Sequence, residues 1–150
     1  IDQTEVLLCQ KLATQQKWLL DNGSTGHIVG DKRYYQYYRA LVGDELKSMN
    51  VYGIATSWAT SPEGIGTIEI CVRNKVKMMK LRLDDVLYVP AAEMNVISQC
   101  TLCRQGFHGS YDYRKSIYSV SKEGLTIVKI DEDDAGLFTF SASNDFLPTH

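Results

Sequence analysis

Trp18-Leu19-Leu20-Asp21-Asn22-Gly23-Ser24-Thr25 places an apolar run directly before a carboxylate and a turn-forming sequence. The apolar run predicts a buried β-strand. Asn22-Gly23 marks a sharp reversal of the backbone, because glycine adopts positive φ at little steric cost. Asp21 is therefore expected at the tip of a strand, with its carboxyl half inside the core.

Composition and charge indicate one ordinary globular domain. A chain of 150 residues with 44% apolar and 23% charged residues can bury roughly two-thirds of its unfolded surface. Sixteen basic and eighteen acidic residues give a net charge of −2. The basic residues are scattered except between Arg73 and Arg82, where they alternate with apolar ones as in a half-exposed strand. We therefore expect no nucleic-acid partner.

Hydropathy and cysteine content indicate the cellular compartment in which the protein is expected. No apolar stretch approaches the ~20 residues needed to cross a bilayer, and no signal peptide is recognisable. Four cysteines are too sparse for a secreted disulfide framework. These patterns predict a cytoplasmic protein with free thiols and no membrane partner.

Cys100, Cys103 and His108 are the residues that could suggest a zinc site. They supply only three ligands at poor spacing, and the two cysteines fall inside a predicted helix. We expect buried thiols that fill the core, no metal and no cofactor.

Turn signals divide most of the chain into short segments of strand character, which favours an all-β barrel or sandwich. The predicted strands cover residues 5–9, 18–21, 49–56, 66–73, 76–82, 85–89, 109–120, 125–130 and 137–140. Residues 98–105 predict a helix, with Ser98 as the N-cap and Gly106 just beyond the C-terminus. The tyrosine-rich residues 34–38 fit a helical turn or an irregular loop. We expect one domain over residues 1–140, followed by a flexible tail over residues 141–150.

The turn at Asp21 resembles the Asp-Thr/Ser-Gly-Ala/Ser signature of retroviral-type aspartic proteases, the retropepsins. Its wider context, Trp18-x-x-Asp21-x-Gly23-x-x-x-His27, is similar to the copia-type (Ty1/copia) retrotransposon branch of that family. A hydrogen-bonded structural role is expected for His27, because aspartic protease chemistry does not need a histidine.

Two later segments extend the resemblance in the right order. Residues 51–56 through 63–70 predict a glycine-containing β-hairpin, which resembles the flap that closes over the substrate in that family. Leu87-Tyr88-Val89-Pro90, followed by Asn95-Val96-Ile97-Ser98, resembles the family's Leu-Tyr-Val-Pro…Asn-Leu-Ile-Ser block. The resemblance covers about residues 18–106 and is specific as a set.

The resemblance implies an all-β, retropepsin-like acid-protease barrel with one short helix. Asp21 would be the catalytic residue, in an active-site turn formed by Asn22, Gly23, Ser24 and Thr25. Peptide hydrolysis by this route needs two carboxyls that share one proton. The chain has only one such turn, so a second copy must supply the other carboxyl in a two-fold homodimer.

The substrate expected from the resemblance is an extended peptide at a polyprotein junction, cleaved inside cytoplasmic virus-like particles. The flap residues would be Ala55, Thr56, Ser57, Trp58, Ala59, Thr60 and Ser61. Candidate pocket residues are Ile28, Val29, Ile54 and Ile97, although ordinary core positions explain each of them equally well. Extra strands from about residue 107 could extend or replace the dimer contact.

Asn22 is the one departure from the family signature, which has Thr or Ser at this position. In the family, the hydroxyl of this Thr or Ser makes a hydrogen bond across the two-fold axis and so stabilises the paired turns. Asn carries additional donor hydrogens, which need partners when they are buried. A second hypothesis is therefore a non-catalytic, domesticated or degenerate retropepsin-like domain that binds peptides or self-associates.

Overall fold

Strands form most of the structure, as the alternation of apolar and polar residues predicts. The computed structural model describes residues 17–45, 51–53 and 56–143. Its elements, in chain order, are β1 (Lys17–Asp21), β2 (Ile28–Val29), the 3-10 helix η1 (Lys32–Tyr34), β3 (Tyr35–Ala40), β4 (Val51–Gly53), β5 (Thr56–Thr60), β6 (Gly64–Arg73), β7 (Met78–Tyr88), β8 (Asn95–Ser98), α3 (Gln99–Arg104), β9 (His108–Asp112), β10 (Ile117–Lys122), β11 (Leu125–Asp131) and β12 (Phe138–Ser141). For these described residues the predicted all-β fold is confirmed, and α3 is the short helix that the sequence predicted.

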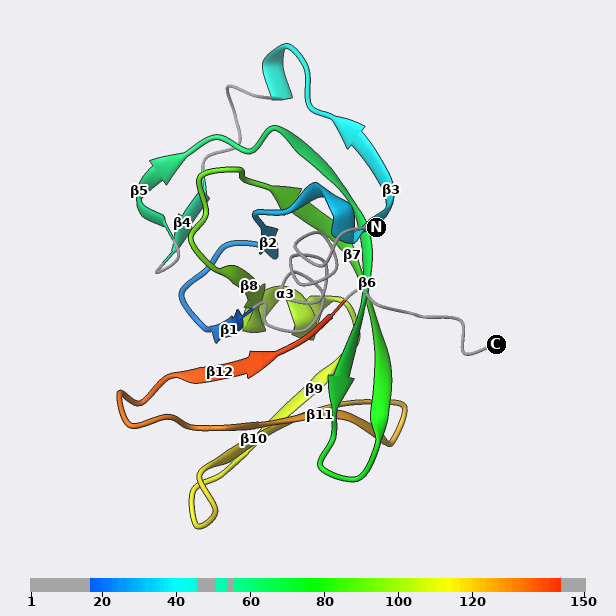
Figure 1. Ribbon diagram of the computed structural model, residues 1–150, viewed down its shortest axis with the longest axis vertical. Helices are drawn as coiled ribbons and strands as arrows, with labels where there is room; N and C mark the ends of the chain where they lie inside the picture. The colour runs from blue at the N-terminus through cyan, green and yellow to red at the C-terminus, as the bar shows by residue number, and fades with distance from the viewer. Residues whose placement is uncertain (1–16, 46–50, 54–55, 144–150) are drawn as a thin grey trace, which may run out of the picture.

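A seven-stranded sheet carries the strand that ends at Asp21. Its order is β12-β1-β8-β2-β7-β6-β3, and separate sheets contain β11-β10-β9 and β4-β5. Figure 1 shows the long strands β6 and β7 running along one side and β9 to β11 crossing at the lower end. β1 pairs in parallel with β8 and antiparallel with β12. Both edges of β1 are therefore occupied by other strands of the same chain.

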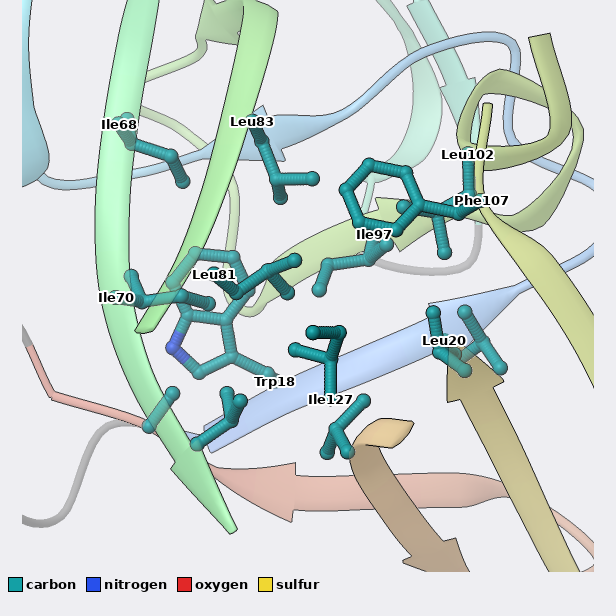
Figure 2. Packing of buried hydrophobic residues seen from close by; sticks show 14 of the residues in the cluster. Trp18, Leu20, Ile68, Ile70, Leu81, Leu83, Ile97, Leu102, Phe107 and Ile127 are labelled. Carbon is teal, nitrogen blue, oxygen red and sulfur yellow. The ribbon is translucent and has the colours of Figure 1, made fainter. Parts of the chain in front are cut away.

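One core joins the large sheet to the C-terminal strands. Trp18 of β1 is fully buried, with its ring 5.2 Å from Tyr34 and 6.3 Å from Phe140 between centroids. Figure 2 shows side chains of β1, β6, β7, β8, α3 and β11 pointing toward one another. The C-terminal strands contribute five buried residues to this cluster: Tyr118, Val120, Ile127, Val128 and Ile130. The segment after residue 107 is therefore part of the domain's core.

Val120→Ala tests this shared core. Val120 is 1% exposed, and removing its two methyl groups should lower the free energy of unfolding by about 2–3 kcal/mol through lost burial and a residual cavity. Denaturant unfolding should show one cooperative transition at a lower midpoint. Val76→Ala is the matched control, because Val76 is 86% exposed, and its effect should stay within about 0.5 kcal/mol. A separate transition for the C-terminal strands would contradict the shared core.

Residues 35–40 form an edge strand, β3, which corrects the expected helical turn or loop. β3 pairs with β6, whose glycines allow a close approach: a Cβ on Gly66 would lie 1.9 Å from the Tyr37 carbonyl oxygen. The Tyr35 hydroxyl also donates a hydrogen bond of 2.7 Å to the Val86 carbonyl of β7. These partners are distant in the sequence, so consecutive tyrosines alone did not reveal the strand.

Residues 78–88 form one strand, β7, where two were predicted. The pairing register with β6 passes from Gly66 opposite Val86 to Ile68 opposite Leu83. Two residues of β7 thus oppose one of β6, and Asp85 takes a positive φ of 55°. A β-bulge accommodates the polar interruption that suggested a break.

Residues 108–122 form a hairpin, β9 and β10, where one strand was predicted over residues 109–120. The Asp112 side chain accepts hydrogen bonds from the backbone N–H groups of Arg114 and Lys115, and Ser116 has a φ of 55°. An Asp side chain that bonds the following backbone is a common turn former. The chain therefore reverses at residues 113–116.

The C-terminal boundary lies slightly later than predicted. β12 continues to Ser141, and Ser143 exchanges backbone hydrogen bonds of 2.7 and 3.3 Å with Cys71. The strand expected over residues 5–9 and the rest of the expected tail lie outside the described residues. Within the described part of the chain, no helix combines the length and apolar character needed to cross a membrane.

Candidate active site

Asp21 is the last residue of β1, where the sequence placed it. It lies opposite Ser98 of β8, and its side chain is half-buried. The carboxylate oxygen Oδ1 accepts a hydrogen bond of 2.8 Å from the backbone N–H of Gly23. A Cβ on Gly23 would lie 3.4 Å from that same oxygen. The carboxylate therefore closes its own turn, which fixes one oxygen toward the loop.

Two serines hold the loop that follows Asp21. The Ser24 hydroxyl donates a hydrogen bond of 2.7 Å to the Gly26 carbonyl. The Ser98 hydroxyl donates to the Ser24 carbonyl at 3.0 Å and accepts from the Thr101 N–H at 3.1 Å. Ser98 is thus the N-cap of α3, as predicted, and also an anchor for the loop.

His27 is fully buried beneath this loop. Its Nδ1 accepts a hydrogen bond of 3.0 Å from the backbone N–H of Ser98. Since a backbone N–H can only donate, Nε2 carries the proton and donates to Oε1 of Gln105 at 2.9 Å. Both ring nitrogens are paired, so the neutral imidazole fits this site.

Burial is the main reason that the pKa of His27 falls to about 4. The hydrogen bond with Gln105 and the charge of Asp85 oppose the fall, whereas the charge of Arg104 adds to it. The expected structural role of His27 agrees with these contacts.

Gln105 extends the network to β7. Its Nε2 donates a hydrogen bond of 2.8 Å to the Asp84 carbonyl, and the Leu87 N–H donates to the His27 carbonyl at 2.9 Å. The two sequence blocks at residues 21–27 and 87–98, far apart in the chain, therefore meet around one loop. Gln105 belongs to no motif in the sequence, and no local signal marked it.

A small hollow of about 130 Å³ opens beside Asp21. Residues from β1, the turn after it, α3, the β11–β12 turn and β12 line it: Leu19, Leu20, Asp21, Asn22, Gln99, Gly136, Leu137 and Phe138. Among the described residues that line it, Asp21 is the one carboxylate. Sequence reasoning missed Gln99 and residues 136–138, because nothing local indicates that they approach Asp21.

Asn22 and Thr25 are exposed, whereas Ser24 is buried. Asn22 lies on the rim of the hollow beside Asp21. Its side chain is thus available at the surface of a single chain, next to the carboxyl.

The hairpin after β3 differs in pairing from the expected flap. β4 pairs with β5 over Thr56–Thr60, whereas the predicted second arm, residues 63–70, falls from residue 64 onward in β6 of the large sheet. Pro62 follows β5 and has no N–H to extend the ladder. Thr56 to Thr60 therefore form an arm of the hairpin, Ser61 is exposed beyond it, and Ala55 and Ile54 lie outside the described residues. In the view of Figure 1 the hairpin lies on the same side of the barrel as the loop between β1 and β2.

Three predicted pocket residues lie in the core. Ile28 and Val29 are 0% exposed and Ile97 is 2% exposed. Val29 and Ile97 pack in the main cluster, and Ile28 packs with Leu19 in a smaller one. In the single chain these three residues therefore occupy core positions, the alternative that the sequence left open.

Cys100 and Cys103 are exposed on α3, which corrects the expectation of buried thiols. The buried face of this short helix is formed by Thr101 and Leu102. The cysteines take the two positions flanking that face, so the helix register exposes them.

The family model described as "Pol polyprotein, beta-barrel domain" matches residues 18–107. The match begins at Trp18 in β1 and ends at Phe107 after α3, and so covers 90 of the 150 residues. It includes the Asp21 loop, β4 and β5, and the His27 network, but not β9 to β12. No curated protein and no solved structure matches the chain significantly.

Proposed function

Because the chain belongs to the family of Pol polyprotein β-barrel domains, we propose that it is the aspartic endopeptidase of a copia-type retrotransposon. The observation that carries the proposal is the carboxylate of Asp21 at a strand tip, on a turn anchored by Ser98 and His27. A carboxylate held this way has the fixed position that general acid–base chemistry requires.

Two copies of Asp21 would form the working site. One carboxylate acts as general base on a water molecule, while the other, protonated, polarises the peptide carbonyl and then protonates the leaving amine. Two like charges so close cannot both ionise cheaply, so the pair titrates with two separated pKa values. A two-fold axis through the turns would bring the same residue from both chains together.

The substrate is proposed to be an extended peptide from a junction in the polyprotein. Main-chain hydrogen bonds would hold it, with alternate side chains in pockets. The hairpin of β4 and β5 is proposed as the flap. Cleavage would take place in cytoplasmic virus-like particles, where many precursor chains are close together and can pair.

Asn22 supports a second candidate, a non-catalytic domain that self-associates or binds peptides. Thr or Ser at this position could pair compactly across a two-fold axis, whereas the longer Asn carries an amide with two donors. Leaving a donor unpaired in such an interface would cost about 1–3 kcal/mol per copy. A weaker dimer is therefore expected even if the chain is an active protease.

The dependence of cleavage on protein concentration tests the proposed enzyme. A precursor fragment that spans both ends of this domain serves as substrate at mildly acid pH, and sedimentation follows the oligomeric state. We expect the rate per chain to rise with concentration as the dimer forms, and then to level off. A protein that dimerises but never cleaves would support the non-catalytic candidate.

A further inference from the structure

The turn between β11 and β12 reaches the tip of β1. Leu20 lies opposite Phe138 in the antiparallel pairing of β1 with β12. The residue before Phe138, Leu137, therefore lies at the level of the residue after Leu20, Asp21. Figure 1 shows β12 running beside β1. Gly136, Leu137 and Phe138 line the hollow that also contains Asp21. These residues lie outside the stretch that matches the family, which ends at residue 107.

Asp133 fixes the shape of this turn. Its Oδ1 accepts hydrogen bonds of 2.9 Å from the N–H groups of Ala135 and Leu137, and its own N–H donates to the Leu137 carbonyl at 2.8 Å. Gly136 has a φ of +80°, which a residue with a side chain rarely adopts. The turn therefore holds Leu137 in one position before any ligand arrives, which lowers the cost of binding.

Tyr118 contacts two of the residues that line the hollow, Phe138 and Gln99. The Phe138 ring packs against Tyr118 and Tyr111, at centroid distances of 5.6 and 5.5 Å. The Tyr118 hydroxyl accepts a hydrogen bond of 2.5 Å from Nε2 of Gln99. Strands of the C-terminal sheet thus hold two residues of the lining in place.

We infer that this hollow is a subsite for one uncharged aliphatic side chain of a peptide bound across Asp21. Four of the residues that line it are apolar, Leu19, Leu20, Leu137 and Phe138, and Asp21 brings a carboxylate to the same lining. The carboxylate disfavours an acidic side chain by like-charge repulsion. A volume of about 130 Å³ suits one side chain of a peptide and is too small for a whole cofactor. The segment 136–138 is then a specificity determinant, an inference that rests on the proposed function.

Leu137→Ala tests the subsite, with Leu125→Ala, at the start of β11, as the matched control. Leu125 is 50% exposed at the far end of β11. For each chain, kcat/KM is measured with a set of peptides that carry Ala, Val, Leu or Asp at one position beside the cleaved bond. We expect the native chain to prefer Leu over Ala by about 10-fold or more, Leu137→Ala to reduce or reverse that preference, and Leu125→Ala to keep it. An unchanged preference in Leu137→Ala would overturn the subsite.

A binding readout separates this inference from the proposed enzyme. In an Asp21→Asn chain with ¹³C-labelled leucine methyls, the same peptides are titrated and the Leu137 methyl signals are followed by NMR. Shifts with the Leu peptide that are clearly larger than those with the Ala peptide support the subsite even if the native chain cleaves nothing. Leu137 methyl signals that stay fixed with every peptide would overturn it, whether or not the native chain is active.

Discussion

Asp21→Asn is expected to abolish peptide cleavage, lowering kcat/KM by at least about 10²–10⁴-fold. An amide cannot take up or release the proton that the general acid and base must exchange. The substitution should preserve the fold, because the Asn side-chain oxygen can still accept the 2.8 Å hydrogen bond from the Gly23 N–H. Rates with a precursor peptide, measured together with thermal unfolding, separate lost chemistry from lost structure.

Asp134→Asn is the matched control for this change. Asp134 is exposed in the turn before β12 and is not among the residues that line the Asp21 hollow. The control should cleave like the native chain. Undiminished cleavage by Asp21→Asn would rule out an aspartic mechanism at this turn.

His27→Gln is expected to destabilise the chain more than His27→Asn does, by about 1–3 kcal/mol at neutral pH. The oxygen of Asn can lie close to the position of Nδ1 and accept from the Ser98 N–H. The longer Gln places its amide close to the position of Nε2 and leaves that buried donor unpaired. Denaturant unfolding at pH 7 measures the difference, and equal stability of the two variants would contradict the assigned bond.

The pH dependence of stability gives a second test of His27. Its pKa is about 4 in the folded chain against 6.5 as a free side chain, so between these values the unfolded chain binds a proton that the native chain does not. Stability should therefore fall as the pH is lowered from 6.5 toward 4, by about 3 kcal/mol in total.

His27→Asn removes this titration and serves as the reference. The native chain should lose stability relative to this variant across that pH range, and the gap should stop growing below pH 4, where the folded His27 also takes a proton. Parallel pH profiles for the two chains would show that His27 does not titrate as a buried neutral imidazole.

Local signals in the sequence predicted the centre of the candidate site well. The strand ending at Asp21 and the helix capped by Ser98 both lie where the residues placed them. An apolar run before Asn-Gly, and a serine before a short helix, act through their immediate neighbours. The structural role expected for His27 also agrees with its contacts.

The features that could not be predicted from the sequence depend on pairing between strands that are far apart in the chain. The hairpin that was expected as the flap is shorter than predicted because residues 64–70 pair with β3 and β7, through glycines that admit the tyrosines of β3. Leu137 reaches Asp21 only because β12 pairs with β1. Neither partner strand can be identified from a local pattern, so the hairpin was misassigned and the hollow was missed.

Mixing native and Asp21→Asn chains tests the central claim, that each chain supplies half of a site, most directly. The total protein concentration is held constant above the dimer dissociation constant, subunits are allowed to exchange, and cleavage is measured against the native fraction. If both Asp21 carboxyls are required, activity follows the square of that fraction and falls to about one quarter in an equal mixture. Activity that falls in direct proportion, to about one half, would show that a single chain works alone and would contradict the account.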